Sequence, residues 1–319
     1  MKPLPFSLPA LLCQEGEEAP DDAPPIHRPA VALFPLSDDV ETPVEEWIAC
    51  YRKQIGDATG LVLADCGMTV PQQRAALLAC RESPGQPSFV ASLALDDEGE
   101  TFDGWQGNAA LILLQSMGCA GVLFAPQDSL AAAEMPRLYR GLWEDARIPT
   151  GVILTEPTGG EAELLSRASL LMAASLPQAR QVRQLGLETG WFQQAPTICP
   201  PPEDDDFIAV SNGHSFLLDA TFDIDGELLC SGSFAEDLLE LESDGCTALR
   251  LLVPDEDALE SLALEQYMVK MPVSIGAPDG ELLEKALRCF CGRAMADGTY
   301  EIAEQELRPL VERYGLIVL

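Results

Sequence analysis

The chain has 319 residues, 47% of them hydrophobic, so it can bury a large core as one α/β barrel or as two ordinary domains. Its 52 acidic residues outnumber its 19 lysines and arginines, giving a formal net charge of −33. Such a surface repels phosphate backbones and anionic lipids, which argues against nucleic acid and membranes as partners. No apolar run approaches the roughly 18–20 residues needed to span a bilayer.

The ten cysteines do not form a metal-binding pattern. None belongs to a C-x-x-C pair, and the closest two are Cys289 and Cys291. The only histidines are His27 and His214, in segments typical of loops or edges. Zinc sites need paired thiolates or nearby histidines, so we expect buried, reduced cysteines, no metal and no cofactor. Reduced cysteines indicate a cytoplasmic protein.

Residues 1–29 are rich in proline and acid and predict a disordered or strap-like tail. From Val31 onward, short apolar runs alternate with amphipathic stretches, which predicts a parallel α/β sheet or barrel in residues 30–194. Pro71 suits the first turn of a helix. The expected strands are 31–34, 61–65, 88–93, 120–124, 151–155 and 169–174, and the helices include 44–55 and 71–82.

Residues 195–206, APTICPPPEDDD, predict a linker because consecutive prolines cannot continue a helix or a central strand. A second α/β segment is expected in residues 207–319. Its predicted strands are 215–220, 227–231, 247–253, 272–276, 293–297 and 316–319, and its predicted helices are 234–245, 256–269, 280–290 and 304–315.

Residues 61–125, from LVLADCGM to AGVLFA, resemble the second half of the homocysteine S-methyltransferase domain of cobalamin-dependent methionine synthases. The resemblance extends over about residues 31–175 and implies a TIM barrel of eight strands. Nothing resembles the family's opening strand, so the match covers the last six strands. We therefore expect a partial or remodelled barrel that strands from residues 207–319 cover or complete, the two segments packing closely together.

Residues 272–319, which include PVSIG, RAMAD and YGLIVL, resemble part of a pterin-binding methyltransferase barrel. This second resemblance covers about residues 245–319. Methionine synthases carry the two modules side by side, so finding both in this order strengthens each.

The first family binds zinc through three thiolates at two strand ends, and the zinc activates the substrate thiol. The matching positions here are Phe124, Ala173 and Ala174, and none of these side chains can bind a metal. Phe124 is expected to be buried at the barrel mouth, in the space that zinc would need.

Three aspartates remain as candidate substrate-binding residues. The first resemblance implies that Asp65 helps to hold a substrate amino group, and the second implies that Asp297 replaces a pterin-binding asparagine. Asp219 ends a predicted strand in the same manner. The alternative for each is an ordinary turn or helix cap. In the pterin family an aspartate follows PLSI, and this chain has Gly276 there.

The two resemblances imply a divergent methionine-synthase-like protein without zinc-thiolate ligands. We expect a non-catalytic binding protein, a pseudoenzyme, whose partner is a protein or a small molecule of one-carbon metabolism. The alternative is an active methyltransferase with a remodelled, metal-free site around Asp65, Asp219 or Asp297.

Overall fold

The computed structural model describes residues 3–17, 23–37, 43–127, 134–154, 161–195, 198, 206–219 and 221–319. The chain forms two compact units. The first takes in Met1–Asp38, Glu45–Gln115 and Cys119–Pro201, and the second takes in Asp39–Val44, Ser116–Gly118 and Pro202–Leu319. Most of the predicted linker lies outside the described residues. None of the helices in the described part of the chain combines the length and apolarity that crossing a bilayer demands.

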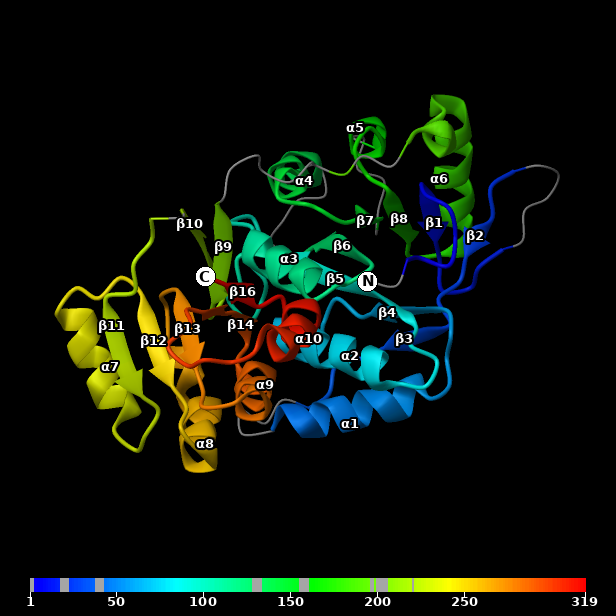
Figure 1. Ribbon diagram of the computed structural model, residues 1–319. Coiled ribbons are helices and arrows are strands. Elements are labelled where there is room, and N and C mark those ends of the chain that lie inside the picture. Colours follow the sequence, from blue (N-terminus) through cyan, green and yellow to red (C-terminus); the bar gives the residue numbers. More distant parts are fainter. Residues whose placement is uncertain are drawn as a thin grey trace. The chain divides into compact units, whose positions relative to one another are not determined.

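The first unit is built on one sheet of eight parallel strands in the order β2-β1-β8-β7-β6-β5-β4-β3 (Figure 1). This is the strand order of an eight-stranded barrel opened between β2 and β3. The strands are β1 (Ala10–Leu12), β2 (Ile26–His27), β3 (Val31–Leu33), β4 (Leu61–Ala64), β5 (Ser88–Leu95), β6 (Gly121–Pro126), β7 (Thr150–Leu154) and β8 (Leu170–Ala173).

The two edge strands of this sheet are consecutive in the chain, which forces the sheet to curl. Four Cα steps join His27 to Val31 and span at most about 15 Å, whereas the edges of a flat eight-stranded sheet would lie about 34 Å apart. The His27 carbonyl accepts a hydrogen bond from the Cys13 N–H, and the Ala30 N–H donates to the Leu61 carbonyl. One extended segment therefore links β1 to β4, and the fold is TIM-barrel-related.

The proposed tail supplies the two strands that the sequence analysis considered missing. β1 lies between β2 and β8, and Leu11 and Leu12 are fully buried. The expectation that residues 207–319 complete this sheet is wrong, because none of the strands described in that segment joins it. Proline and acid around residues 18–25 concealed short apolar strands on either side. Strands of two or three residues are too short to show a periodic pattern.

Large apolar side chains fill the interior of the curled sheet. Leu4, Phe6 and Leu8 pack against this cluster from the N-terminal segment, and the Ser88 hydroxyl donates to the Pro3 carbonyl at 2.6 Å. β5 begins at Ser88, so this segment lies at the amino ends of the strands. The cluster comprises Ala10, Leu12, Leu61, Leu63, Val90, Leu123, Leu170 and Met172.

Helices connect the strands of the first unit and cover the outer face of its sheet, as expected of right-handed parallel crossovers. Thr69 and Ser175 cap α2 and α6 with their side chains, and each helix has proline in its first turn. The helices are α1 (Val44–Ile55), α2 (Val70–Glu82), α3 (Gly107–Ser116), α4 (Met135–Glu144), α5 (Glu161–Leu165) and α6 (Leu176–Thr189), followed by the short η2 (Trp191–Gln193).

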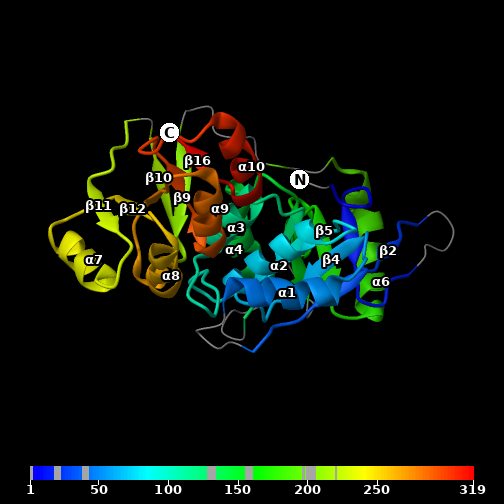
Figure 2. The same ribbon diagram turned by 60° about the horizontal axis from the view of Figure 1, so that its bottom comes forward.

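The second unit contains a parallel sheet of five strands in chain order, β11-β12-β13-β15-β16. These strands are β11 (Gly226–Leu229), β12 (Leu249–Leu252), β13 (Val273–Gly276), β15 (Met295–Ala296) and β16 (Ile317–Val318). Helices α7, α8 and α9 follow one another along this sheet (Figure 2). The helices are α7 (Phe234–Ser243), α8 (Glu256–Glu265), η3 (Gln266–Met268), α9 (Gly280–Cys289) and α10 (Glu304–Tyr314).

An antiparallel sheet packs on part of the five-stranded sheet. It has the order β10-β9-β14, with β9 (Phe207–Ser211), β10 (His214–Leu218) and β14 (Gly292–Arg293). Ala209 and Leu218 form a buried cluster with Met295 and Ile317. The sequence analysis missed β9 because it placed the first strand after the linker at residues 215–220. The hairpin covers a sheet face that the crossover helices leave open.

Candidate ligand-binding site

Asp65 follows β4 at the carboxyl end of the first sheet, where barrel sites are built. Its Oδ1 accepts the Gly67 N–H at 2.8 Å, and its carbonyl accepts the Met68 N–H. The carboxylate therefore shapes the turn that leads to Thr69, the cap of α2. Its role in binding a substrate stays a prediction, and the turn role of the alternative interpretation is present in the structure.

The neighbouring thiol is poorly suited to act as a nucleophile or metal ligand. Burial raises the pKa of Cys66, and the Asp65 carboxylate raises it further. Metal binding and nucleophilic attack require the thiolate, which this environment disfavours. The Asp65–Cys66 pair therefore offers no substitute for zinc activation of a thiol.

Phe124 is fully buried, as predicted, but it does not face the barrel mouth. Successive residues of a strand point to opposite faces, and Leu123 belongs to the interior cluster. The Phe124 ring accordingly packs on Tyr139 of α4, with ring centroids 6.0 Å apart. The interpretation that Phe124 fills a vacated zinc site is wrong, because the ring lies on the helix side of the sheet.

The other two positions where the family places thiolates differ in exposure. Ala173 is fully buried and alternates with the interior residue Met172, so it also faces the helices. Ala174 is exposed, and its N–H is bonded to the Gln178 side chain at the start of α6. Within the described residues, no group of three histidine, cysteine or acidic side chains could hold a metal ion.

Asp219 follows β10 on the second unit and is exposed. Its Oδ1 accepts both the N–H of Thr221 at 2.8 Å and the hydroxyl at 2.6 Å. These two hydrogen bonds lower the pKa of the carboxyl. β10 pairs antiparallel with β9, so Asp219 does not end a strand of the parallel sheet.

Asp297 follows β15 at the carboxyl end of the five-stranded sheet and belongs to a charged cluster centred on Arg250. Its Oδ2 accepts hydrogen bonds from Arg250 Nε at 2.7 Å and Arg250 Nη2 at 2.5 Å. Arg250 Nη1 also binds Glu227 at 3.0 Å. The other oxygen, Oδ1, accepts the Thr299 N–H at 3.1 Å and the Thr299 hydroxyl at 2.7 Å.

These contacts use the full accepting capacity of Asp297, since a carboxylate offers about four lone-pair sites. Burial disfavours the charged form, but the hydrogen bonds from Thr299 and Arg250 outweigh it and lower the pKa of Asp297. The side chain is ionised at neutral pH and anchors the loop after β15. A ligand that hydrogen-bonds to Asp297 would have to compete with Arg250 or Thr299.

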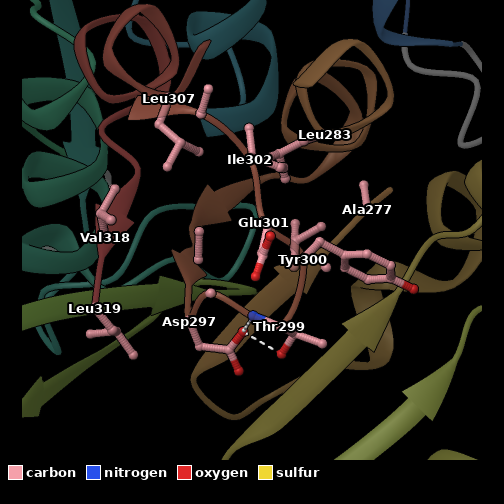
Figure 3. Close-up of a pocket in the computed structure, with 15 residues that line it drawn as sticks. Ala277, Leu283, Asp297, Thr299, Tyr300, Glu301, Ile302, Leu307, Val318 and Leu319 are labelled. Atoms are coloured by element: carbon pink, nitrogen blue, oxygen red, sulfur yellow. Dashed lines mark hydrogen bonds between the residues drawn. The ribbon is translucent and has the colours of Figure 1, made fainter. Parts of the chain in front are cut away.

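A cavity of about 450 Å³ opens beside Asp297 at the carboxyl ends of β13, β15 and β16 (Figure 3). The loop of residues 297–303 forms one wall, and Leu283 and Leu307 contribute from α9 and α10. Its volume is in the range of small-molecule sites, and its position is where open parallel sheets bind ligands. The other lining residues are Ile275, Gly276, Ala277, Ala296, Val318 and Leu319.

Tyr300 occupies the space beside Gly276, the position where the pterin family has an aspartate. A Cβ added at Gly276 would lie 3.1 Å from the Tyr300 ring. A side chain there would make a tight contact with the ring, so the glycine and the tyrosine fit each other. The sequence analysis noted the missing aspartate but had no signal for the ring that replaces it.

Arg250 and Glu301 were also missed by the sequence analysis. Arg250 interrupts the apolar run LRLLV, and a charge inside a strand indicates a buried partner. That signal was available. Glu301 lines the cavity together with Asp297 and Thr299 (Figure 3). The cavity can thus hold the apolar part of a ligand next to the Glu301 carboxylate.

The chain was compared with known proteins. No protein-family model matches it, and a search of curated proteins finds no match.

Proposed function

We propose that this protein is a divergent relative of the methionine-synthase group that binds a small molecule without catalysing thiol methylation. The observation that carries the proposal concerns the three strand-end positions of the first unit that match the family's zinc ligands, and where their side chains lie. Phe124 and Ala173 face the helices, and Ala174 lies exposed at a helix start. Zinc cannot be held by a phenylalanine and two alanines, and a thiol substrate would find no metal to lower its pKa.

The barrel-related topology of the first unit supports the ancestry, since its strand order is that of an eight-stranded barrel. The second unit supports the binding activity through the cavity beside Asp297. The buried cysteines Cys13, Cys80, Cys119 and Cys230 are reduced. We propose that the protein works in the cytoplasm, where reduced thiols persist.

The test combines metal analysis with binding and turnover measurements on the full chain. Purified protein is assayed for zinc, and homocysteine and methyl-tetrahydrofolate are titrated by calorimetry and supplied together in a methyl-transfer assay. We expect less than stoichiometric zinc and no methylation of homocysteine. Stoichiometric zinc, or turnover of either compound, would support the alternative of an active methyltransferase.

A variant separates the two outcomes further. Cys66→Ser removes the thiol nearest Asp65 without altering the turn that Asp65 forms with Gly67. If turnover is seen and this variant abolishes it, the remodelled site lies at Asp65, and the conclusion that Cys66 is unsuited to take part is wrong. If the natural protein and the variant are equally inactive, the non-catalytic proposal stands.

A further inference from the structure

The charged side chains that line the cavity beside Asp297 are all negative. Its fifteen lining residues include two carboxylates, Asp297 and Glu301, and no lysine, arginine or histidine. The remaining walls are mainly apolar, with Ile275, Leu283 and Leu307 among them. An anionic ligand would find no positive partner in this lining.

The two carboxylates are not equivalent. Arg250 and Thr299 donate hydrogen bonds to Asp297, so its charge is offset. Among the residues that the structure describes, no hydrogen bond or ion pair engages the Glu301 side chain, which lines the cavity and is exposed to solvent (Figure 3). A carboxylate beside apolar walls gains most from a ligand that carries a positive charge or a strong donor.

Tyr300 adds an aromatic surface to the same cavity. Its ring lies against Gly276, where a Cβ would be only 3.1 Å away. Aromatic faces attract organic cations, and Tyr300 and Glu301 both line this cavity. The apolar residues can then receive the hydrocarbon part of the ligand.

We infer that this cavity binds a small organic cation, an ammonium group attached to an apolar body, with Glu301 as the charge partner and Tyr300 as part of the wall. The inference rests on the proposed binding function and names its ligand class. It points away from phosphates, carboxylates and other anions, because these would face Glu301.

The test uses three probes of equal length, butylammonium, 1-butanol and butyrate, titrated into the full chain. Backbone amide chemical shifts of Gly276 and Gly298, which line the cavity, report binding at the site itself. We expect butylammonium to bind at least tenfold more tightly than 1-butanol or butyrate, with shifts concentrated on these amides. Equal binding of butyrate and butylammonium would overturn the inference.

Two matched variants separate the site from the general attraction of cations to an acidic protein. Glu301→Gln preserves the shape and removes the charge, and should weaken butylammonium binding at least tenfold. Glu260→Gln removes an exposed charge on α8, outside the cavity lining, and should change binding less than twofold. Equal losses in the two variants, or no loss in Glu301→Gln, would contradict the assigned ligand class.

This result is independent of the methyl-transfer assay. Turnover of homocysteine would overturn the non-catalytic proposal and leave the cation preference standing. If none of the three probes shifts the amide signals of Gly276 and Gly298, the assigned ligand class is wrong. That outcome would leave the results on zinc content and methyl transfer unchanged.

Discussion

The two units build related sheets and use their inner faces differently. In both, parallel strands follow one another in chain order with helices between them. The first sheet curls until one extended segment links its two edges, and apolar side chains fill the inside. The second sheet has only five strands, and its inner face carries the Glu227–Arg250–Asp297 cluster and an antiparallel hairpin.

The comparison shows how a short parallel sheet can be stabilised without closure. A curled sheet has a packed interior and needs no cover, whereas an open sheet must bury its second face against another element. The hairpin β9–β10 provides that cover in the second unit. Asp297, one member of the cluster around Arg250, lies at the carboxyl end of the sheet. The loop of residues 297–303 lines a cavity there. The binding site therefore lies where the packing is incomplete.

The strongest challenge to the closed interior of the first unit is deletion of residues 1–13. This removes β1 from between β2 and β8, together with the fully buried Leu11 and Leu12. We expect the first unit to lose its cooperative unfolding transition, because the interior would open to solvent and two strand edges would be exposed. All four tryptophans lie in this unit, so tryptophan fluorescence during urea unfolding measures it selectively.

Deleting only Met1 and Lys2 is the control, and it should leave the transition unchanged. A sharp transition in the larger deletion, with the natural midpoint, would mean that the N-terminal strands are dispensable and that residues 1–29 act as the tail first predicted.

Phe124→Ala tests the outer layer of the same unit. The ring is fully buried against Tyr139, and its loss leaves a cavity between β6 and α4. We expect the free energy of unfolding of the first unit to fall by about 3–5 kcal/mol. Phe102→Ala is the matched control, since 54% of that residue is exposed, and it should change stability by less than about 0.5 kcal/mol.

Much of this fold could be predicted from the sequence. The helix predicted at residues 44–55 is confirmed as α1, and each strand predicted from Val31 onward has an observed counterpart whose ends lie within two residues of the prediction, although residues 155 and 220 at two predicted ends lie outside the described residues. Long amphipathic helices give a strong periodic signal, and short continuous apolar runs that alternate with them indicate buried strands. β1 and β2 gave none, because they contain three and two residues and depend on partners that lie far along the chain.

The candidate site was less predictable, for a physical reason. Asp297 could be selected because it follows an apolar run, but its contacts with Arg250 and Thr299 depend on how three strands align. The direction of Phe124 depends on the register of β6, which a single strand sequence leaves open. Tyr300 and Gly276 come together only after the loop closes over the strand end.

Arg250→Met tests the charged inner face of the second unit. The substitution keeps the apolar stem and leaves Asp297, whose side chain is 9% exposed, without its cation. Removing one partner of a fully buried pair costs about 3–5 kcal/mol, and partial exposure of Arg250 lowers our expectation to about 2–3 kcal/mol. Hydrogen exchange of the amides in β12 and β15 measures this unit.

The double variant Arg250→Met with Asp297→Asn should recover part of the loss, because no unpaired charge remains. The effect also depends on pH in a known direction. The pKa of Asp297 is lower in the folded than in the unfolded protein. The Arg250–Asp297 pair therefore makes its full contribution to the stability of the second unit above the unfolded pKa, about pH 4. That contribution is lost as the pH falls through the folded pKa. A difference between natural protein and Asp297→Asn that stayed constant from pH 7 to pH 2 would contradict the pairing.

The smallest expected effect concerns Asp225, which joins the amino ends of β11 and β12. Its carboxylate accepts the N–H groups of Thr247 and Ala248 and the Thr247 hydroxyl, at 2.8–3.1 Å. These bonds, with that of Ala248 the largest, lower the pKa of Asp225 to about 2. In Asp225→Asn an amide NH₂ replaces one accepting oxygen, so a donor faces the Thr247 N–H and one bond is lost.

We expect Asp225→Asn to weaken the second unit less than Arg250→Met, since Asp225 is exposed and water can replace the lost bond. Because the folded pKa is lowered, the natural carboxylate stabilises above its unfolded pKa, and this stabilisation disappears as the pH falls toward about 2. The β11 and β12 amides of the natural protein should therefore be better protected from hydrogen exchange than those of the variant at pH 7, and the two proteins should converge near pH 2.

Asp223→Asn, two residues earlier in the same exposed loop, should leave protection unchanged at both pH values. If Asp223→Asn and Asp225→Asn behaved alike, general repulsion within the acidic surface would explain the effect. The hydrogen bonds from Thr247 and Ala248 to Asp225 would then contribute nothing to stability.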